Sequence, residues 1–212
     1  MEFPRKSGDA LKVTEIIFLS TCRVRLVVEI ADPQSYTTHG EARIPRRLFK
    51  MFPRMAAQRC CNDGGYSFRR EAQATEIPHV LEHVILEIQD QVRRGSGAPF
   101  AGETQWNWTR DPRGRFYVTV DYDNEIVALG AIRLAERVIN ALDSKDVACL
   151  DMGREIARLR DLARLSRRHH HRPRPSGSDT PFFPLPEYSK PAGFPEEEPA
   201  GLYERLPDTA AA

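Results

Sequence analysis

Residues 76–89 read "EIPHVLEHVILEIQ" and predict the central helix of the fold, which we expect to run roughly from Glu76 to Arg93. Apolar residues recur at three- and four-residue spacing, so they gather on one side of a helix and polar residues on the other. The apolar side holds Ile77, Val80, Leu81, Val84, Ile85 and Ile88, and the polar side holds Glu76, His79, Glu82, His83, Glu87 and Asp90. Periodicity alone leaves two interpretations open: the water-exposed face of an ordinary surface helix, or a metal site.

The order of His79, Glu82 and His83 favours the metal site. Histidines four residues apart lie above one another on a helix and can direct ring nitrogens at one ion. Glu82 lies on the same side, close enough to act on a zinc-bound water. This H-x-x-E-H order is the inverted zincin arrangement, in which the glutamate serves as general base. Leu86 lies among these polar residues, which would be unusual if this face met only water.

Zinc needs a third ligand, which inverted zincins take from a glutamate on a later helix. We expect Glu125 to supply it, because this residue lies in the first turn of an otherwise apolar helix, just after a strand. A carboxylate there also interacts favourably with the helix dipole, which is the structural alternative. Glu87, one turn further along the first helix, is the competing ligand.

The surrounding pattern predicts an α+β fold, with a small antiparallel or mixed sheet packed against several helices. "KVTEIIFLS", "RVRLVVEIA" and "RFYVTVDY" are typical of strands, and "PRRLFKMFPRMAAQR" predicts a helix interrupted at Pro53. "GSGAPFAGETQWNWTRDPRG" predicts a long loop. Two further helices are predicted by "NEIVALGAIRLAERVINAL" and "DMGREIARLRDLARLSRR".

The chain divides into a flexible N-terminus (residues 1–12), an α+β domain (13–166) and a disordered proline-rich tail (167–212). Nine of the sixteen prolines lie from Pro173 onward. Such a segment cannot form helix interiors or central strands, and it has few aliphatic residues to bury. We expect this tail to be the place where a protein partner binds.

Composition indicates a globular cytoplasmic protein that binds neither nucleic acid nor membrane. The formal net charge is +1, no apolar run approaches the ~20 residues that span a bilayer, and the N-terminus lacks a signal-peptide core. The four cysteines are Cys22, Cys60, Cys61 and Cys149, and none are in C-x-x-C spacing. We expect reduced, mostly buried thiols rather than zinc ligands.

Several blocks of the chain carry a resemblance to a known family. They are "IPRRLFKMFPRM", "CCNDGGYSF", "HVLEHVILEIQ", the pair Thr109–Arg110 and the strand leading into "DYDNEIV". From about Val13 to Arg164 the chain resembles the N-terminal domain of cyanophycin synthetase. The ATP-grasp and Mur-ligase-like domains of the synthetase do not follow, so we expect a stand-alone homologue that does not itself synthesise the polymer.

The resemblance implies a zinc-dependent, metallopeptidase-like amide hydrolase that acts on cyanophycin or a related Asp/Arg peptide-like polymer. It implies that His79 and His83 are zinc ligands, Glu82 the base and Glu125 the third ligand. The alternative is a non-catalytic module, related to the synthetase N-domain, that binds the polymer or a partner.

Substrate contacts are predicted from residue chemistry. Arg110 is expected to pair with a substrate carboxylate or to steady the oxyanion during catalysis, with a surface salt bridge as the alternative. Trp106 is expected to stack on guanidinium groups, unless it covers the core. Asp121 and Asp123, near the end of a strand, are the expected acceptors for arginine side chains.

Overall fold

Four strands form an antiparallel sheet that packs against helices, which confirms the predicted α+β class. The computed structural model describes residues 10–19, 21–32, 36–41, 43–60, 66–93, 97–143 and 150–170. The strands are β1 (Leu11–Phe18), β2 (Arg23–Ile30), β3 (Gly102–Gln105) and β4 (Arg115–Asp121), in the spatial order β1-β2-β4-β3. β3 lies in the segment predicted to be a long loop. That prediction is wrong here because "GETQ" has no strand pattern of its own and becomes a strand by pairing with β4.

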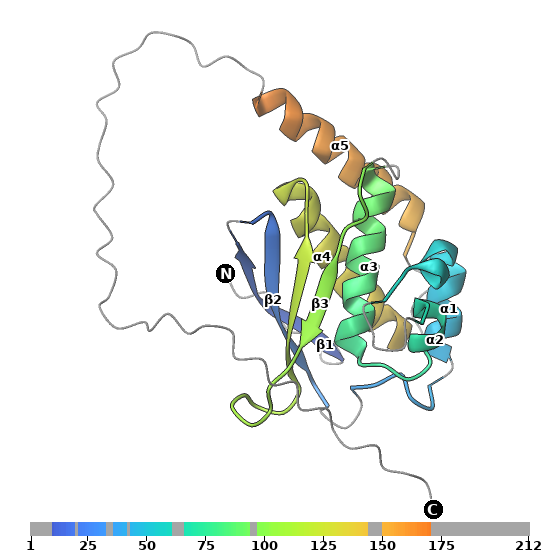
Figure 1. The fold of residues 1–212 in the computed structure, drawn as a ribbon. Helices are drawn as coiled ribbons and strands as arrows, with labels where there is room; N and C mark the ends of the chain where they lie inside the picture. Colours follow the sequence, from blue (N-terminus) through green and yellow to red (C-terminus); the bar gives the residue numbers. More distant parts are fainter. Residues whose placement is uncertain are drawn as a thin grey trace, which may run out of the picture. The chain divides into compact units, whose positions relative to one another are not determined.

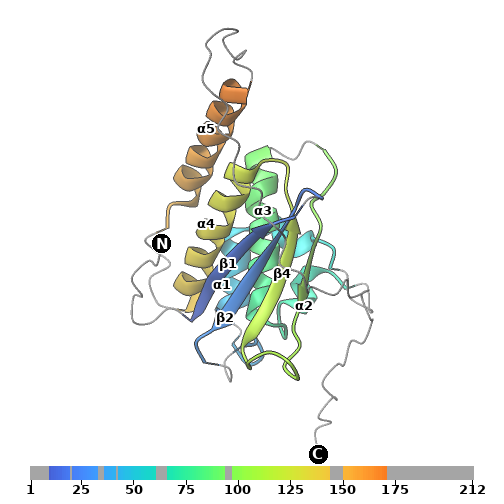
Figure 2. The ribbon, with the colours of Figure 1, turned by 90° about the vertical axis from the view of Figure 1, so that its left-hand side faces the viewer.

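The two faces of the sheet differ in polarity. Alternate residues of β2 and β4 (Val24, Leu26, Val28, Phe116, Val118 and Val120) are fully buried. They face the helices, which lie behind the sheet in Figure 2. The other face carries ion pairs, among them Arg115 with Glu29 at 2.8 Å and Arg23 with Glu103 at 3.2 Å. Burial mainly on one face is what period-two alternation predicts, although Val27 and Thr119 on the other face are also buried.

The helices come from the segments where helical periodicity predicts them, apart from the single turn at Phe68–Glu71, which was not predicted. They are α1 (Arg43–Met51), α2 (Phe68–Glu71), α3 (Ile77–Arg93), α4 (Glu125–Asp143) and α5 (Met152–His170), with the 3₁₀ helix η1 (Pro53–Ala57) after α1. The break at Pro53 is confirmed, since a proline cannot continue α1. α5 extends to His170, so its last four residues fall within the segment predicted as the tail (167–212). The rest of it lies outside the described residues.

The direction of α3 decides what its two ends can reach. The backbone N–H of Ile77, at its start, donates to the carbonyl of Tyr36. Near its end, the amide of Gln89 donates to the carbonyl of Asp121, the last residue of β4. α3 therefore runs alongside the sheet with its C-terminal end at the end of β4, between the sheet and the α1–α2 region (Figure 1).

None of the described helices is both long enough and apolar enough to cross a bilayer. All the described residues belong to one compact unit, residues 1–172, and residues 173–212 lie outside the described part of the chain.

Candidate metal centre

The polar face of α3 is covered by the chain between Arg54 and Cys60. Arg54 pairs with Asp90 at 3.2 Å, the amide of Gln58 donates to Glu87 at 3.0 Å, and Cys60 Sγ lies 3.1 Å from His79 Nε2. The segment therefore runs antiparallel along α3. The interpretation of this face as water-exposed is wrong, because a second segment of the chain occupies it.

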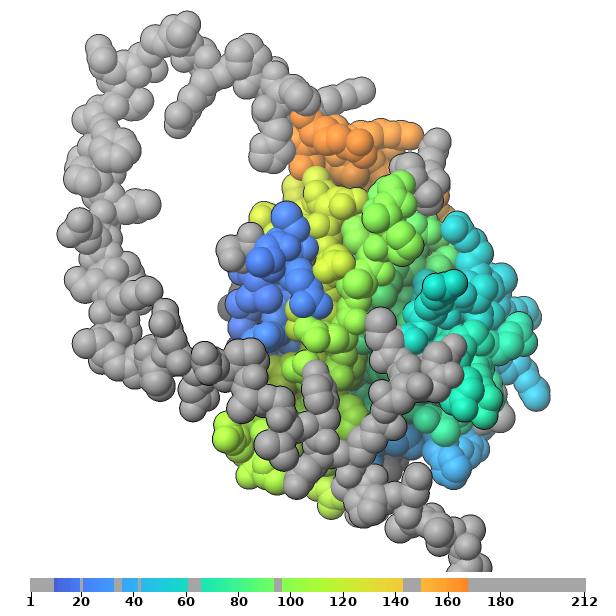
Figure 3. Space-filling model, in the orientation of Figure 1, coloured from blue at the N-terminus to red at the C-terminus, as the bar shows by residue number. Residues whose placement is uncertain are grey.

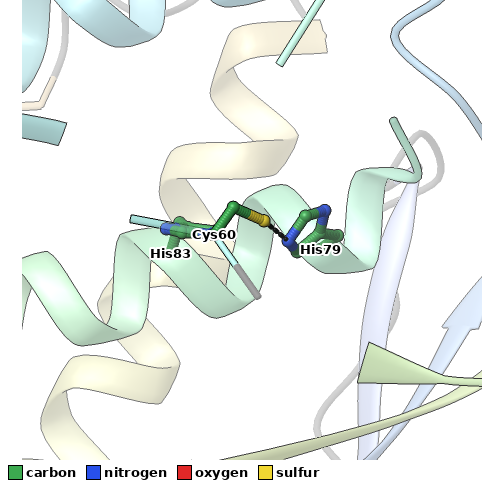
Figure 4. Close-up of side chains that lie close together, drawn as sticks. All are labelled: Cys60, His79 and His83. Atoms are coloured by element: carbon green, nitrogen blue, oxygen red, sulfur yellow. Dashed lines mark hydrogen bonds between the residues drawn. The ribbon is translucent and has the colours of Figure 1, made fainter. Parts of the chain in front are cut away.

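Cys60, His79 and His83 form a group that could hold a metal ion. One ligand atom from each residue lies within 4.8 Å of the others. Figure 4 shows the Cys60 side chain over α3 beside both histidines, with its contact to His79 dashed. One thiol and two imidazoles are a donor set that suits zinc, which accepts sulfur and nitrogen ligands together. The residues present therefore fit the expected metal.

The expectation about the cysteines is corrected by this arrangement. Both cysteines within the described residues are free thiols, but Cys22 is exposed and Cys60 only partly buried. Cys22 has a φ of 55° at the turn between β1 and β2, which holds it out of the core. Cys60 belongs to the metal group instead of the core. Cys61 and Cys149 lie outside the described residues.

Hydrogen bonds orient the ring of His79. Its Nδ1 lies 2.7 Å from the hydroxyl oxygen of Thr75, and that hydroxyl donates to the carboxylate of Glu76 at 3.3 Å. Since the hydroxyl proton is directed at Glu76, we assign the Nδ1 proton to His79. Its Nε2, which faces Cys60, then carries the lone pair that a metal needs.

A longer relay orients His83. Its Nδ1 lies 2.8 Å from Oε1 of Gln58, whose Nε2 donates to Glu87. The other carboxylate oxygen of Glu87 accepts from Gln91 at 2.8 Å. A carboxylate accepts only, so the amide of Gln58 must present its oxygen to His83, and His83 donates from Nδ1. Partners of this kind hold a metal-binding histidine in the ligating tautomer. Glu87, the competing ligand, instead contacts this network.

Burial keeps both histidines neutral. Desolvation lowers the pKa of His79 to about 4, and desolvation together with repulsion from His79 lowers the pKa of His83 to about 3. Phe68 contributes to this burial, since its ring stacks on that of His83 with a centroid separation of 3.8 Å. At neutral pH both imidazoles are therefore unprotonated and able to bind a metal.

Glu82 lies on the same helix, between the two histidines in sequence, but it is not part of the metal group. Thr104 of β3 donates to its carboxylate at 2.6 Å, and the side chain is 4% exposed. Gly102 makes this approach of β3 to α3 feasible, because a Cβ there would lie 2.8 Å from Oε1 of Glu82. Burial raises the pKa of Glu82 to about 7, despite the hydrogen bond from Thr104. The carboxyl is therefore suited to accept and return a proton at neutral pH.

The segment that contains this site matches a known protein family. Residues 25–144 match the cyanophycin synthase-like N-terminal domain. The chain belongs to this family. The match includes the whole of α3 and β4 and the complete metal group. No curated protein matches the chain.

In this cyanophycin synthase-like domain, Glu125 does not lie with the histidines. It is exposed at the start of α4, just beyond the end of β4, where Gln89 of α3 also lies. Gln89 comes ten residues after His79. At 1.5 Å per residue that separation is about 15 Å along the helix. Cys60, and not Glu125, is therefore the third residue of the group that could hold a metal ion.

The predicted arginine acceptors lie at this same distant end. Asp121 pairs with Arg23 at 3.2 Å and Asp123 with Arg93 at 3.4 Å. The structure does not bring either carboxylate to the metal group. Their role toward a substrate stays a prediction.

Trp106 and Arg110 lie at the end of β4 that is nearer the start of α3. Trp106 packs against Phe116 and Trp108, with ring centroids 5.6 and 6.1 Å away, so it covers the core. Arg110 is exposed in the turn that follows, where its backbone N–H donates to Asn107. The substrate contacts of Trp106 and Arg110 stay predictions.

Four residues of the site were missed by sequence reasoning. They are Gln58, Cys60, Gly102 and Thr104, and each reaches α3 from a distant part of the sequence. Cys60 carried a weak signal, as a thiol inside one of the blocks that resemble the family. The other three carried none, because a glutamine, a glycine and a threonine are common in any loop.

Proposed function

We propose that this protein is a zinc-dependent hydrolase of amide bonds in a peptide-like polymer related to cyanophycin. The observation that carries the proposal is the convergence of Cys60, His79 and His83, with a buried, proton-accepting Glu82 on the same helix. The membership of the family supports the class of substrate.

Each residue has a defined task in this proposal. Cys60, His79 and His83 would hold the zinc, which would supply Lewis acidity at the site. Glu82 would accept a proton from the water that attacks the amide carbon and give it to the leaving amine as the C–N bond breaks. Thr104 positions that carboxylate through the hydrogen bond it donates.

One observation favours a second candidate, a non-catalytic module that binds polymer or partner. Glu82 and His83 are 4% and 3% exposed. With a fourth protein ligand, the Cys/His/His group would also be suited to a structural zinc that holds the segment from Arg54 to Cys60 against α3. A partner bound through the proline-rich tail fits either candidate.

Zinc content and hydrolysis together separate the candidates. Purified protein, Glu82→Gln and Glu103→Gln are analysed for zinc and then incubated with cyanophycin. Glu103 is the matched control, since it is a glutamate of β3 that pairs with Arg23 on the opposite face of the sheet. Hydrolysis by the protein and by Glu103→Gln, with no hydrolysis by a zinc-loaded Glu82→Gln, supports the enzyme. Zinc binding without hydrolysis by any of the three supports the structural site, and absence of zinc refutes both.

A further inference from the structure

The chain that covers α3 is unusually rich in positive charge. Eight of the 29 residues from Arg43 to Glu71 are arginine or lysine, and two are acidic, whereas the whole chain has a net charge of +1. Two of the eight are neutralised by ion pairs, Arg43 with Glu41 and Arg54 with Asp90. The excess is therefore local to α1, η1 and α2, which form the cyan-to-teal surface beside α3 in Figure 3.

Five exposed cations remain on this surface, and we call them the basic surface: Arg46, Lys50, Arg59, Arg69 and Arg70. Within the part of the chain that the structure describes, none of the five forms an ion pair. Elsewhere in that part, arginines such as Arg23 and Arg115 pair with carboxylates. Unpaired cations gathered on one side create a field that attracts anions.

Contacts join this surface to the metal group. Arg59 precedes Cys60 directly and bridges to Ser67, at the start of α2. Arg69 lies over Phe49 of α1 at 5.7 Å. Phe68 directly precedes Arg69 in the chain, and its ring stacks on that of His83. Arg59 and Arg69 of the basic surface therefore stand next in the chain to Cys60 and Phe68, the two residues that this region brings to His79 and His83.

We propose that the basic surface binds the acidic chain of the substrate, a polypeptide with free carboxylates such as an aspartate polymer, and guides it to the metal group. The inference rests on the proposed function and narrows its substrate.

The aromatic groups of the surface favour an acidic peptide over a nucleic acid. Proteins bind single-stranded nucleic acids largely by stacking bases on aromatic rings. The exposed ring of Tyr66 is covered by the guanidinium of Arg70 at 3.7 Å, and Arg69 covers Phe49. The face of each ring that the guanidinium covers is not open to a base. The guanidinium groups can instead donate hydrogen bonds to carboxylates.

Binding of fluorescein-labelled deca-aspartate, followed by fluorescence anisotropy on the zinc-loaded protein, tests the proposal. We compare the protein with the triple variant Arg59→Gln/Arg69→Gln/Arg70→Gln. The matched control, Arg154→Gln/Arg158→Gln/Arg164→Gln, removes the same charge from exposed positions of α5. We expect the first triple to weaken binding about tenfold or more, the control to change it less than about twofold, and salt to weaken it.

Three results would overturn the proposal: no binding of deca-aspartate, equal weakening by the two triple variants, or tighter binding of a single-stranded oligonucleotide. Circular dichroism verifies that both variants are folded.

Binding of deca-aspartate is also measured with Glu82→Gln, because the surface does not depend on that carboxyl. If deca-aspartate binds and no polymer is hydrolysed, the role of the basic surface is supported and the proposed hydrolase activity is refuted. If cyanophycin is hydrolysed and deca-aspartate does not bind, the hydrolase activity is supported and the role of the basic surface is refuted.

Discussion

Glu82→Gln is expected to stabilise the metal-free protein, by an amount that depends on pH. Burial moves the pKa of this carboxyl from 4.5 to about 7 in the folded protein. Between those pH values the folded chain holds a proton that the unfolded chain has released, so the free energy of unfolding falls as pH rises. At 1.36 kcal/mol per pKa unit, the cost is about 3 kcal/mol above pH 7 and vanishes below about pH 4.5. Glutamine has the same shape but cannot ionise, so it avoids this cost.

Urea unfolding in chelator, followed by tryptophan fluorescence from pH 4.5 to pH 8, measures the difference in unfolding free energy between variant and protein. The histidines, whose pKa values burial lowers, are present in both proteins and cancel in the difference. We expect a difference near zero at the acid end and about 3 kcal/mol at the alkaline end. Glu103→Gln, at a half-exposed position, is expected to stay within about 0.5 kcal/mol at every pH. A difference for Glu82→Gln that does not change with pH would refute the reasoning.

Three further substitutions test the site. Gly102→Ala places a Cβ 2.8 Å from Glu82 and is expected to lower the free energy of unfolding by about 1–3 kcal/mol, measured by urea denaturation. Cys60→Ser removes the only sulfur from the metal group, and we expect zinc content, measured by elemental analysis, to fall well below that of the protein. Gln58→Leu interrupts the relay from His83 and is expected to weaken zinc binding about 10–100-fold in a chelator competition.

Each of these has a matched control in the chain. A Cβ on Gly153 would have Asp151 Oδ1 as its nearest neighbour at 3.4 Å, so Gly153→Ala is expected to leave stability within about 1 kcal/mol. Cys22 is exposed and outside the metal group, and Cys22→Ser should retain zinc. Gln73 is exposed and donates to the carbonyl of Arg69, so Gln73→Leu should bind zinc normally. Loss of zinc from Cys22→Ser to the level of Cys60→Ser would contradict the assignment of Cys60.

The local elements were predictable from the sequence because they depend on neighbours in the chain. Alternation in "RVRLVVEI" determines which face of β2 is buried, and Pro53 alone is enough to end α1. The spacing of His79 and His83 places both rings on one side of any helix that contains them. β3 was missed because its four residues have no pattern apart from their partner strand.

Sequence alone therefore determined the fold class, the helix that bears H-x-x-E-H and the family resemblance. Only the tertiary structure decided that Cys60, 19 residues from His79, completes the metal group and that Glu125 does not. The physical reason is that the ligand set depends on how the segment before Cys60 docks on α3. That docking is held by contacts between residues 25, 29 and 36 positions apart, which no local periodicity encodes.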